Sequence, residues 1–183
     1  VCSSDLTCFT EARTRAYLDD IRSTSSLPMK TLVNTHHHGD HTHGNYLVTG
    51  AVIVGHELCR QTVIDTGLQA LHPLFPDVAW GDLELAPPFI TFNDRLELHV
   101  DDLKVELIFM RPAHTTNDIV AWLPERTLLF AGDLIFNQGT PFVAMGSVSG
   151  SLPDNNLANN IFLAAIFFSE KNSNFFNLDI ISF

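Results

Sequence analysis

The sequence has few basic residues and no long apolar run. Lysine and arginine number 10 against 21 acidic residues in 183, which gives a formal net charge of −11. A surface with this excess of negative charge repels a phosphate backbone, so we expect no nucleic-acid partner. The longest strongly apolar run, Ile161–Phe168, is far shorter than the roughly 20 residues of a membrane-spanning helix. The sequence therefore predicts no membrane partner.

Cysteine is also scarce, and the three present follow no regular spacing: Cys2, Cys8 and Cys59. Disulfide-rich secreted domains carry a denser, paired set, so this usage excludes a disulfide framework and fits a reducing compartment. We expect the three thiols to be buried or incidental side chains and the protein to be cytoplasmic, although a signal peptide ahead of residue 1 would change the second expectation.

The two ends differ in character from the middle of the chain. Val1–Leu6 is what the run GTG TGC TCT TCC GAT CT encodes with any final base, a string that resembles a sequencing adapter. We expect residues 1–6 to be an assembly artefact and the natural sequence to begin upstream of Thr7. Residues 153–183 are crowded with Asn, Phe and Ile and lack Arg, so we expect a non-native or divergent tail. Residues 7–152 then form one partial domain.

Hydrophobic periodicity within residues 7–152 predicts both helices and strands. Thr10 can cap a helix over 11–22, and a short β-branched strand covers 30–34. After a loop without helix, a strand at 51–54 precedes a helix over 56–66 that Gly67 ends. Residues 68–88 predict a long connection, and two hairpins follow, 95–100 with 103–110 and 119–123 with 127–131. This order predicts an α/β sandwich of mixed sheets.

Seven consecutive residues after the first strand carry five potential metal ligands, in the order Thr35-His36-His37-His38-Gly39-Asp40-His41. Neutral imidazole and carboxylate are ligands that suit zinc. Alternate residues of an extended segment point the same way, so His36 and His38 can bind one ion while His37 faces elsewhere. Once the chain turns, Asp40 and His41 can face a second ion.

Two later residues repeat the pattern of a ligand placed just after a strand. His114 follows the strand that ends at Met110, and Asp133 follows the strand over 127–131. Alone, each would more often be structural: a surface histidine and a turn former. Together with the histidine cluster they predict that three strand ends meet at one sheet edge and form a metal site.

The ordered set His36-x-His38-x-Asp40-His41, His114 and Gly132-Asp133 resembles the metallo-β-lactamase superfamily of hydrolases over residues 7–152. The resemblance implies an αββα sandwich with a pair of zinc ions between two sheets. It implies that His36, His38 and His114 hold the first ion, Asp40 and His41 the second, and that Asp133 bridges both. Aspartate at 133 resembles the glyoxalase II-like and general metallohydrolase branches rather than the antibiotic-hydrolysing lactamases, which most often have cysteine there.

The sequence departs from the family at both ends. The family usually supplies a further histidine to the second zinc, yet no histidine follows His114. The first strands of the family, expected before Thr7, are also absent. We therefore expect an incomplete sandwich that lacks its first strands and C-terminal part, with one ligand missing from the second site.

The resemblance implies a zinc-dependent hydrolase in which metal-bound hydroxide, oriented by Asp40, attacks the ester, thioester or amide carbonyl of a small molecule. Two alternatives stay open: a mononuclear iron oxygenase acting on thiols or persulfides, and a non-catalytic fragment of the hydrolase. Oligomeric state and substrate are not readable from the sequence. Candidates for contacts around the metals are His37, His43, Thr115, Thr116 and Asn117, and four aromatics could line a pocket or fill the core: Phe75, Trp80, Phe89 and Phe142.

Overall fold

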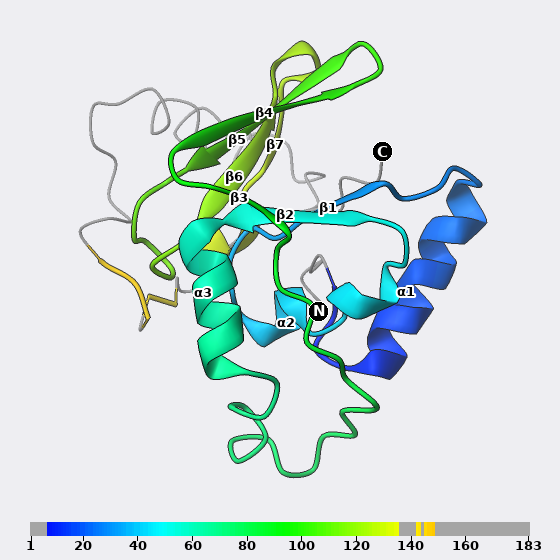
Figure 1. Cartoon of the computed structure of the whole chain (residues 1–183), viewed down its shortest axis with the longest axis vertical. Helices are drawn as coiled ribbons and strands as arrows, with labels where there is room; N and C mark the ends of the chain where they lie inside the picture. The colour runs from blue at the N-terminus through cyan, green and yellow to red at the C-terminus, as the bar shows by residue number, and fades with distance from the viewer. Residues whose placement is uncertain (1–6, 136–141, 144, 149–183) are drawn as a thin grey trace.

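The computed structural model describes residues 7–135, 142–143 and 145–148. The expected artefact at residues 1–6 and the tail at 153–183, with its apolar run Ile161–Phe168, lie outside these residues. Two sheets lie at the centre of the described chain, and three helices lie on the far side of one of them (Figure 1). The fold is thus a layered α/β sandwich, as the sequence predicts.

The first sheet is parallel and carries the histidine cluster. Its strands β1 (Thr31–Val33), β2 (Val52–His56) and β3 (Ile90–Phe92) lie in that order. Helix α1 (Glu11–Thr24) precedes β1, α2 (Gly39–Thr42) and the 3-10 turn η1 (Asn45–Leu47) follow it, and α3 (Glu57–Thr66) follows β2. Each crossover therefore contains a helical segment, as is usual between parallel strands.

The second sheet is an antiparallel meander. Strands β4 (Arg95–Val100), β5 (Leu103–Phe109), β6 (Ile119–Leu123) and β7 (Leu128–Phe130) pair strictly with their neighbours along the chain. Short turns join β4 to β5 and β6 to β7, the latter through the 3-10 turn η2 (Pro124–Arg126). Because β5 and β7 both run opposite to β6, their carboxyl ends lie at the same edge.

Alternating side chains build the core between the two sheets. Val33 and Val54 of the parallel sheet pack in one cluster with Leu107 and Ile119 of the meander. The neighbouring residues on β1 and β2 face the other way and pack with Leu18 of α1 in a second cluster. This period of two fixes which face of each strand meets which layer, so the loops at the strand ends are held rigidly.

Three sequence expectations require correction. Both sheets are of one type among the described residues, one parallel and one antiparallel, whereas mixed sheets were expected. The loop between the first two strands contains α2, a helix of four residues, whereas none was expected. Strand β3 was not expected, because three residues after two prolines offer no measurable alternation. The other helices and strands fall within a few residues of their predicted bounds.

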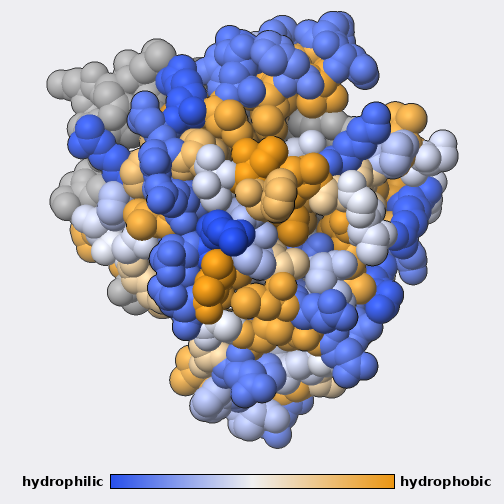
Figure 2. Space-filling model, in the orientation of Figure 1, coloured by the Kyte–Doolittle hydropathy of each residue, from blue (hydrophilic) through white to orange (hydrophobic). Residues whose placement is uncertain are grey.

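The surface over the parallel sheet is apolar in places. Figure 2 shows apolar side chains gathered over the middle of the view, where Figure 1 places β2 and β3. Val52, Phe89 and Ile90 of these segments are exposed. No helix in the described part of the chain is long and apolar enough to cross a membrane.

Candidate metal centre

Three strand ends bring the ligand-type side chains together. His36 and His38 follow β1, His114 lies in the loop between β5 and β6, and Asp133 lies in the 3-10 turn η3 (Gly132–Leu134) after β7. The backbone N–H of Ile119, at the start of β6, donates to the carbonyl of Thr35 over 2.9 Å. This bond ties the meander to the end of β1, so the loops of the two sheets meet.

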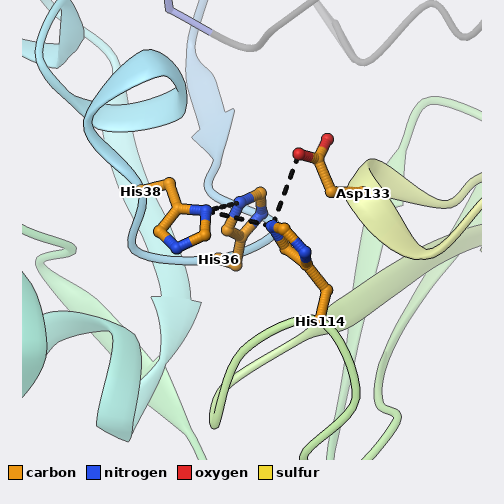
Figure 3. Close-up of side chains that lie close together, drawn as sticks. All are labelled: His36, His38, His114 and Asp133. Atoms are coloured by element: carbon orange, nitrogen blue, oxygen red, sulfur yellow. Dashed lines mark hydrogen bonds and ion pairs between the residues drawn. The ribbon is translucent and has the colours of Figure 1, made fainter. Parts of the chain in front are cut away.

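Four side chains form one compact group (Figure 3). One ligand atom from each of His36, His38, His114 and Asp133 lies within 4.8 Å of all the others. The facing atoms are ring nitrogens: His36 Nε2 lies 3.1 Å from His38 Nδ1, which lies 3.0 Å from His114 Nε2. An Asp133 carboxylate oxygen lies 3.4 Å from His114 Nε2. The structure therefore gathers the three histidines and the aspartate that the sequence predicted.

The other nitrogen of each of these rings faces a separate partner. Thr35 Oγ1 lies 3.2 Å from His36 Nδ1, and the carbonyl of Phe142 is within hydrogen-bond reach of His114 Nδ1. Met145 Sδ lies 3.2 Å from His38 Nε2. Such outer partners fix the tautomer and the rotation of a metal-binding histidine. The rings of His36 and His114 are thereby held with Nε2 turned towards the centre of the group, and that of His38 with Nδ1 turned there.

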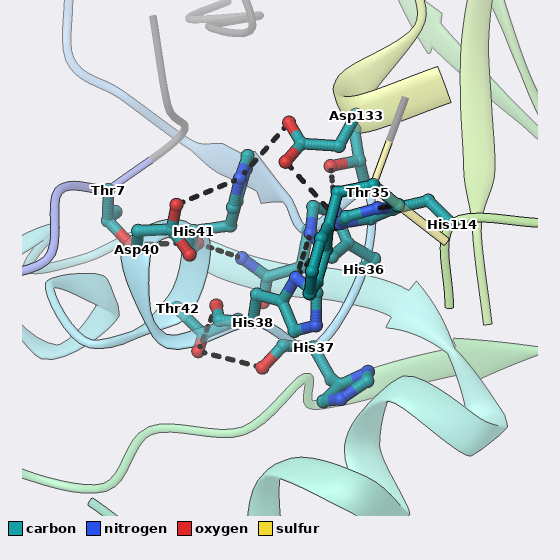
Figure 4. A network of polar contacts seen from close by, with 12 residues as sticks. Thr7, Thr35, His36, His37, His38, Asp40, His41, Thr42, His114 and Asp133 are labelled. Atoms are coloured by element: carbon teal, nitrogen blue, oxygen red, sulfur yellow. Dashed lines mark hydrogen bonds and ion pairs between the residues drawn. The ribbon is translucent and has the colours of Figure 1, made fainter. Parts of the chain in front are cut away.

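Asp40 and His41 lie beside the group rather than within it (Figure 4). His41 Nε2 is 3.4 Å from an Asp133 carboxylate oxygen and 3.7 Å from Asp40 Oδ2. The His41 side chain is fully buried, whereas that of Asp40 is 42% exposed. Asp133 therefore stands between two sets of candidate ligands, with His114 on one side and His41 on the other.

Burial shapes the protonation of the histidines. Burial, with a smaller contribution from the neighbouring imidazoles, lowers the pKa of His36 well below its usual value and that of His38 to about 3. Burial acts on Asp133 in the opposite direction, but its hydrogen bond to His41 and the adjacent histidines outweigh burial, so its pKa falls. Neutral imidazoles beside an ionised carboxylate are the protonation states that bind a cation.

The donor set fits a transition metal. Three imidazole nitrogens and one carboxylate oxygen are borderline donors, which suit zinc and also suit iron(II). Three ring nitrogens that converge beside a carboxylate, two of them on the buried rings of His36 and His114, form an arrangement that a shared cation would stabilise. We infer that the group binds a metal ion, and the donors alone do not distinguish zinc from iron.

Asp118 is a residue of this site that the sequence reasoning missed. Its buried carboxylate accepts hydrogen bonds from the backbone N–H groups of Ala113 and Thr115, at 3.1 and 2.8 Å, and from the Thr115 hydroxyl at 2.7 Å. These bonds close the loop around His114. An aspartate a few residues beyond a predicted ligand, among threonines, is a turn signal that could have identified it.

A buried network under His41 was also missed. The carbonyl of His41 accepts from the Asn34 side-chain amide at 3.1 Å and from the Thr7 hydroxyl at 2.9 Å. Asn34 and Asn45 also bond to each other through both of their amide groups. The network fixes the turn that follows His38. Asparagine at the end of a strand is too common for the sequence to have marked these residues.

The remaining candidates separate into different environments. Asn117 Nδ2 lies 2.9 Å from His37 Nδ1, and His43 stacks on Phe9. Thr115 belongs to the Asp118 loop and Thr116 is exposed. The four aromatics do not share a pocket: Phe75 and Trp80 pack on Phe9, Phe89 is 82% exposed, and Phe142 lies beside His114.

The chain matches one known family over most of its length. The family model described as the metallo-beta-lactamase superfamily matches residues 10–157. A metallo-beta-lactamase from Pontibacter korlensis superimposes with a TM-score of 0.64 at 19% identity, over 95% of this chain and 73% of the other. The metallo-beta-lactamase IND-7 gives the same TM-score at 15% identity, over 86% of this chain and 65% of the other. At these low identities, the two structures show only that this chain shares their fold.

Two curated relatives match in sequence. The 2,4-dinitroanisole O-demethylase subunit alpha of Nocardioides sp. (strain JS1661) is 25% identical over 62% of this chain. The hydroxyacylglutathione hydrolase of Methylococcus capsulatus (strain ATCC 33009 / NCIMB 11132 / Bath) is 27% identical over 63% of it. The matches span 31% and 38% of these relatives, so this chain corresponds to about a third of their length.

Proposed function

The chain belongs to the metallo-beta-lactamase superfamily, and from this premise we propose that it is a zinc-dependent hydrolase of esters, thioesters or amides. The observation that supports the proposal most directly is the convergence of His36, His38, His114 and Asp133 within 4.8 Å. One of the curated relatives bears the name of a hydrolase, which agrees with the proposal. The net charge of −11 favours a small-molecule substrate over nucleic acid.

In this proposal two groups of residues hold two zinc ions. His36 Nε2, His38 Nδ1 and His114 Nε2 would hold the first, Asp40 and His41 would take part in holding the second, and Asp133 lies between the two groups. Bound zinc lowers the pKa of a coordinated water to about 7 and polarises a substrate carbonyl. Thr35 and the Phe142 carbonyl keep two of the rings turned towards the ion.

Asp40 is the proposed proton carrier. Its carboxylate is 42% exposed and lies at the edge of the ligand group, so it can accept a hydrogen bond from the attacking water. After the proton passes to this carboxylate, the same group can return it to the leaving oxygen, sulfur or nitrogen. The buried carboxylate of Asp118 cannot serve this role, because its oxygens are occupied by the loop around His114.

Metal analysis and turnover test the proposal together. We expect inductively coupled plasma mass spectrometry on the purified chain to find zinc, up to two ions per chain, and the zinc-loaded protein to hydrolyse p-nitrophenyl acetate or an acyl-glutathione thioester. His38→Ala removes a central ligand and should lower the rate more than 100-fold, since even partners outside the ligand set change activity about 10 to 100-fold. His99→Ala, at an exposed histidine on β4, should leave the rate unchanged.

Two results would contradict this function. One iron per chain with oxygen uptake in the presence of a thiol would assign the site to an oxygenase instead. Zinc that binds equally well to the unaltered chain and to His38→Ala would show that the His36, His38, His114 and Asp133 group is not the metal site. Because another curated relative is named for 2,4-dinitroanisole, that compound belongs in the substrate panel.

A further inference from the structure

Two loops from different sheets carry the three candidate histidine ligands. Residues 34–38 follow β1 of the parallel sheet, and residues 110–118 join β5 to β6 in the antiparallel sheet. A bond between two side chains outside the ligand group joins these loops: Asn117 Nδ2 lies 2.9 Å from His37 Nδ1. His37 is flanked by the ligands His36 and His38, and Asn117 lies three residues beyond His114.

Both partners in this bond are buried and fixed on their own side. His37 is 7% exposed and Asn117 is 0% exposed. Asn117 receives support from its own loop, since its backbone N–H donates to Thr115 Oγ1 at 3.1 Å and Thr115 donates to Asp118. The carbonyl of His37 accepts from the Thr42 hydroxyl in α2. A hydrogen bond between two immobilised side chains fixes the loops that carry them relative to each other, because neither side chain can move without breaking its other hydrogen bonds.

The ligand rings need such a restraint from outside. For one cation to bind His36 Nε2, His38 Nδ1 and His114 Nε2, each nitrogen must present a lone pair. These nitrogens lie 3.0 to 3.1 Å apart, and any hydrogen bonds between them are given up when all three turn lone pairs to the cation. Contacts among the ligands therefore cannot hold the two loops in the arrangement that binds metal. The backbone bond from Ile119 to Thr35 supplies one restraint at the strand end, and His37 with Asn117 supplies another beside the rings.

We propose that His37 and Asn117 are positioning residues that hold the His36–His38 segment against the His114 loop and so preorganise the first metal site. The proposal rests on the metal site of the proposed function but not on its chemistry or substrate. Residues just outside a metal's ligands change metal affinity about 10 to 100-fold, and we expect that loss when either side chain is removed. Because both removals break the same bond, their effects should not add.

Cobalt(II) titration of the full chain tests the proposal, since the visible absorption of cobalt reports both affinity and ligand geometry. We expect Asn117→Ala and His37→Ala each to bind cobalt(II) about 10 to 100-fold more weakly than the unaltered chain, with altered visible bands. The double variant should bind within about twofold of the weaker single variant. Arg111→Ala is the matched control, because the Arg111 side chain is exposed in the same loop. Thr116 is not suitable, since its hydroxyl accepts a hydrogen bond from Asn117 Nδ2 at 3.2 Å.

Several outcomes would overturn the proposal. Unchanged affinity and spectrum in Asn117→Ala, or losses that multiply in the double variant, would show that the bond does not position the ligands. Failure of either single variant to give the far-ultraviolet circular dichroism of the folded chain would assign the bond to folding instead. If the unaltered chain bound no cobalt(II) or zinc, the proposed function would fail with it; if it bound both and the variants matched it, only the positioning role would fail.

Discussion

At the scale of single residues, Gly132 shows how backbone geometry protects the metal centre. Its φ of +54° lies in the left-handed region, and a Cβ placed there would lie 2.8 Å from Thr35 Oγ1. Thr35 is the partner of His36 Nδ1, and Asp133 follows Gly132 directly. Glycine therefore serves two needs at this position, an unusual φ and close approach to a group that orients a ligand.

We predict that Gly132→Ala destabilises the protein and weakens metal binding. The left-handed backbone alone costs an alanine about 1 to 2 kcal/mol, and the displaced Thr35 adds to that cost. Gly50→Ala isolates the first part, since Gly50 has a φ of +86° and open space around its Cβ. Urea unfolding and zinc titration of both variants check the prediction. Equal losses of stability and equal zinc affinity in the two variants would contradict it.

The individual metal-ligand residues were predictable, because the density and spacing of histidines can be read directly from the sequence. His36, His38, His114 and Asp133 were all named from the sequence, and the structure gathers them. Asp118 and the Phe142 carbonyl were not, for different reasons. A backbone carbonyl has no residue signature, and a buried aspartate in a turn differs from a surface aspartate only through its three-dimensional neighbours.

At the scale of elements, His56 shows a histidine with a structural role. Its Nδ1 accepts from the backbone N–H of Leu58 at 3.1 Å and so caps α3, while its Nε2 donates to the carbonyl of Asn93 at 2.9 Å. Its ring stacks on Phe109 with centroids 4.0 Å apart. One side chain thereby joins α3 to the segment after β3 and to the meander. The sequence predicts no function for His56, and this residue is not among the four grouped ligand-type side chains.

We predict that His56→Ala lowers the free energy of unfolding by about 2 to 3 kcal/mol, since it removes a helix cap and leaves the Asn93 carbonyl without its donor. Metal affinity should not change. His99→Ala, at an exposed site on β4, should cost less than about 0.5 kcal/mol. Equilibrium unfolding in urea, followed by circular dichroism, measures both. A loss of metal without a loss of stability would argue against this role.

Elements were predictable where they are long or bounded by clear signals. Helices α1 and α3 are capped at their N-termini by Thr10 and His56 and end just before Ser25 and Gly67, close to the predicted bounds. Helix α2 and strand β3 were missed because tertiary bonds, rather than local periodicity, determine them: β3 exists through its register with β2, and α2 through the turn between the ligands.

At the scale of the whole molecule, the candidate metal group spans both sheets. His36 and His38 belong to the parallel sheet's end, and His114 and Asp133 to the meander's end. An ion bound by all four would hold the layers together at one edge of the sandwich. The layering was predictable because the alternation of apolar and polar residues in each strand can be read from the sequence. The assignment of each strand to the parallel or the antiparallel sheet depends on pairings between distant strands, which the sequence alone does not reveal.

We predict that zinc stabilises the entire fold. A ligand that binds only the folded state at 100 times its Kd adds about 2.7 kcal/mol, which corresponds to a rise in Tm of about 5 to 10 °C for a chain of this size. Differential scanning calorimetry with zinc, and after removal of zinc by chelation, measures the rise. His38→Ala should show none of it. An equal rise in that variant would mean that zinc stabilises the protein from elsewhere.

The neighbour-to-neighbour pairing of β4 through β7 bears on the order of events in folding. Each strand of this meander meets the strand adjacent in the chain, so its contacts are local and close quickly. The parallel sheet must bring together β2 and β3 across α3 and the long connection after it, which is slower. We therefore expect the antiparallel meander to form first and the parallel sheet to form after it. Metal uptake, which needs residues from both, then becomes the last step in the maturation of a newly made chain.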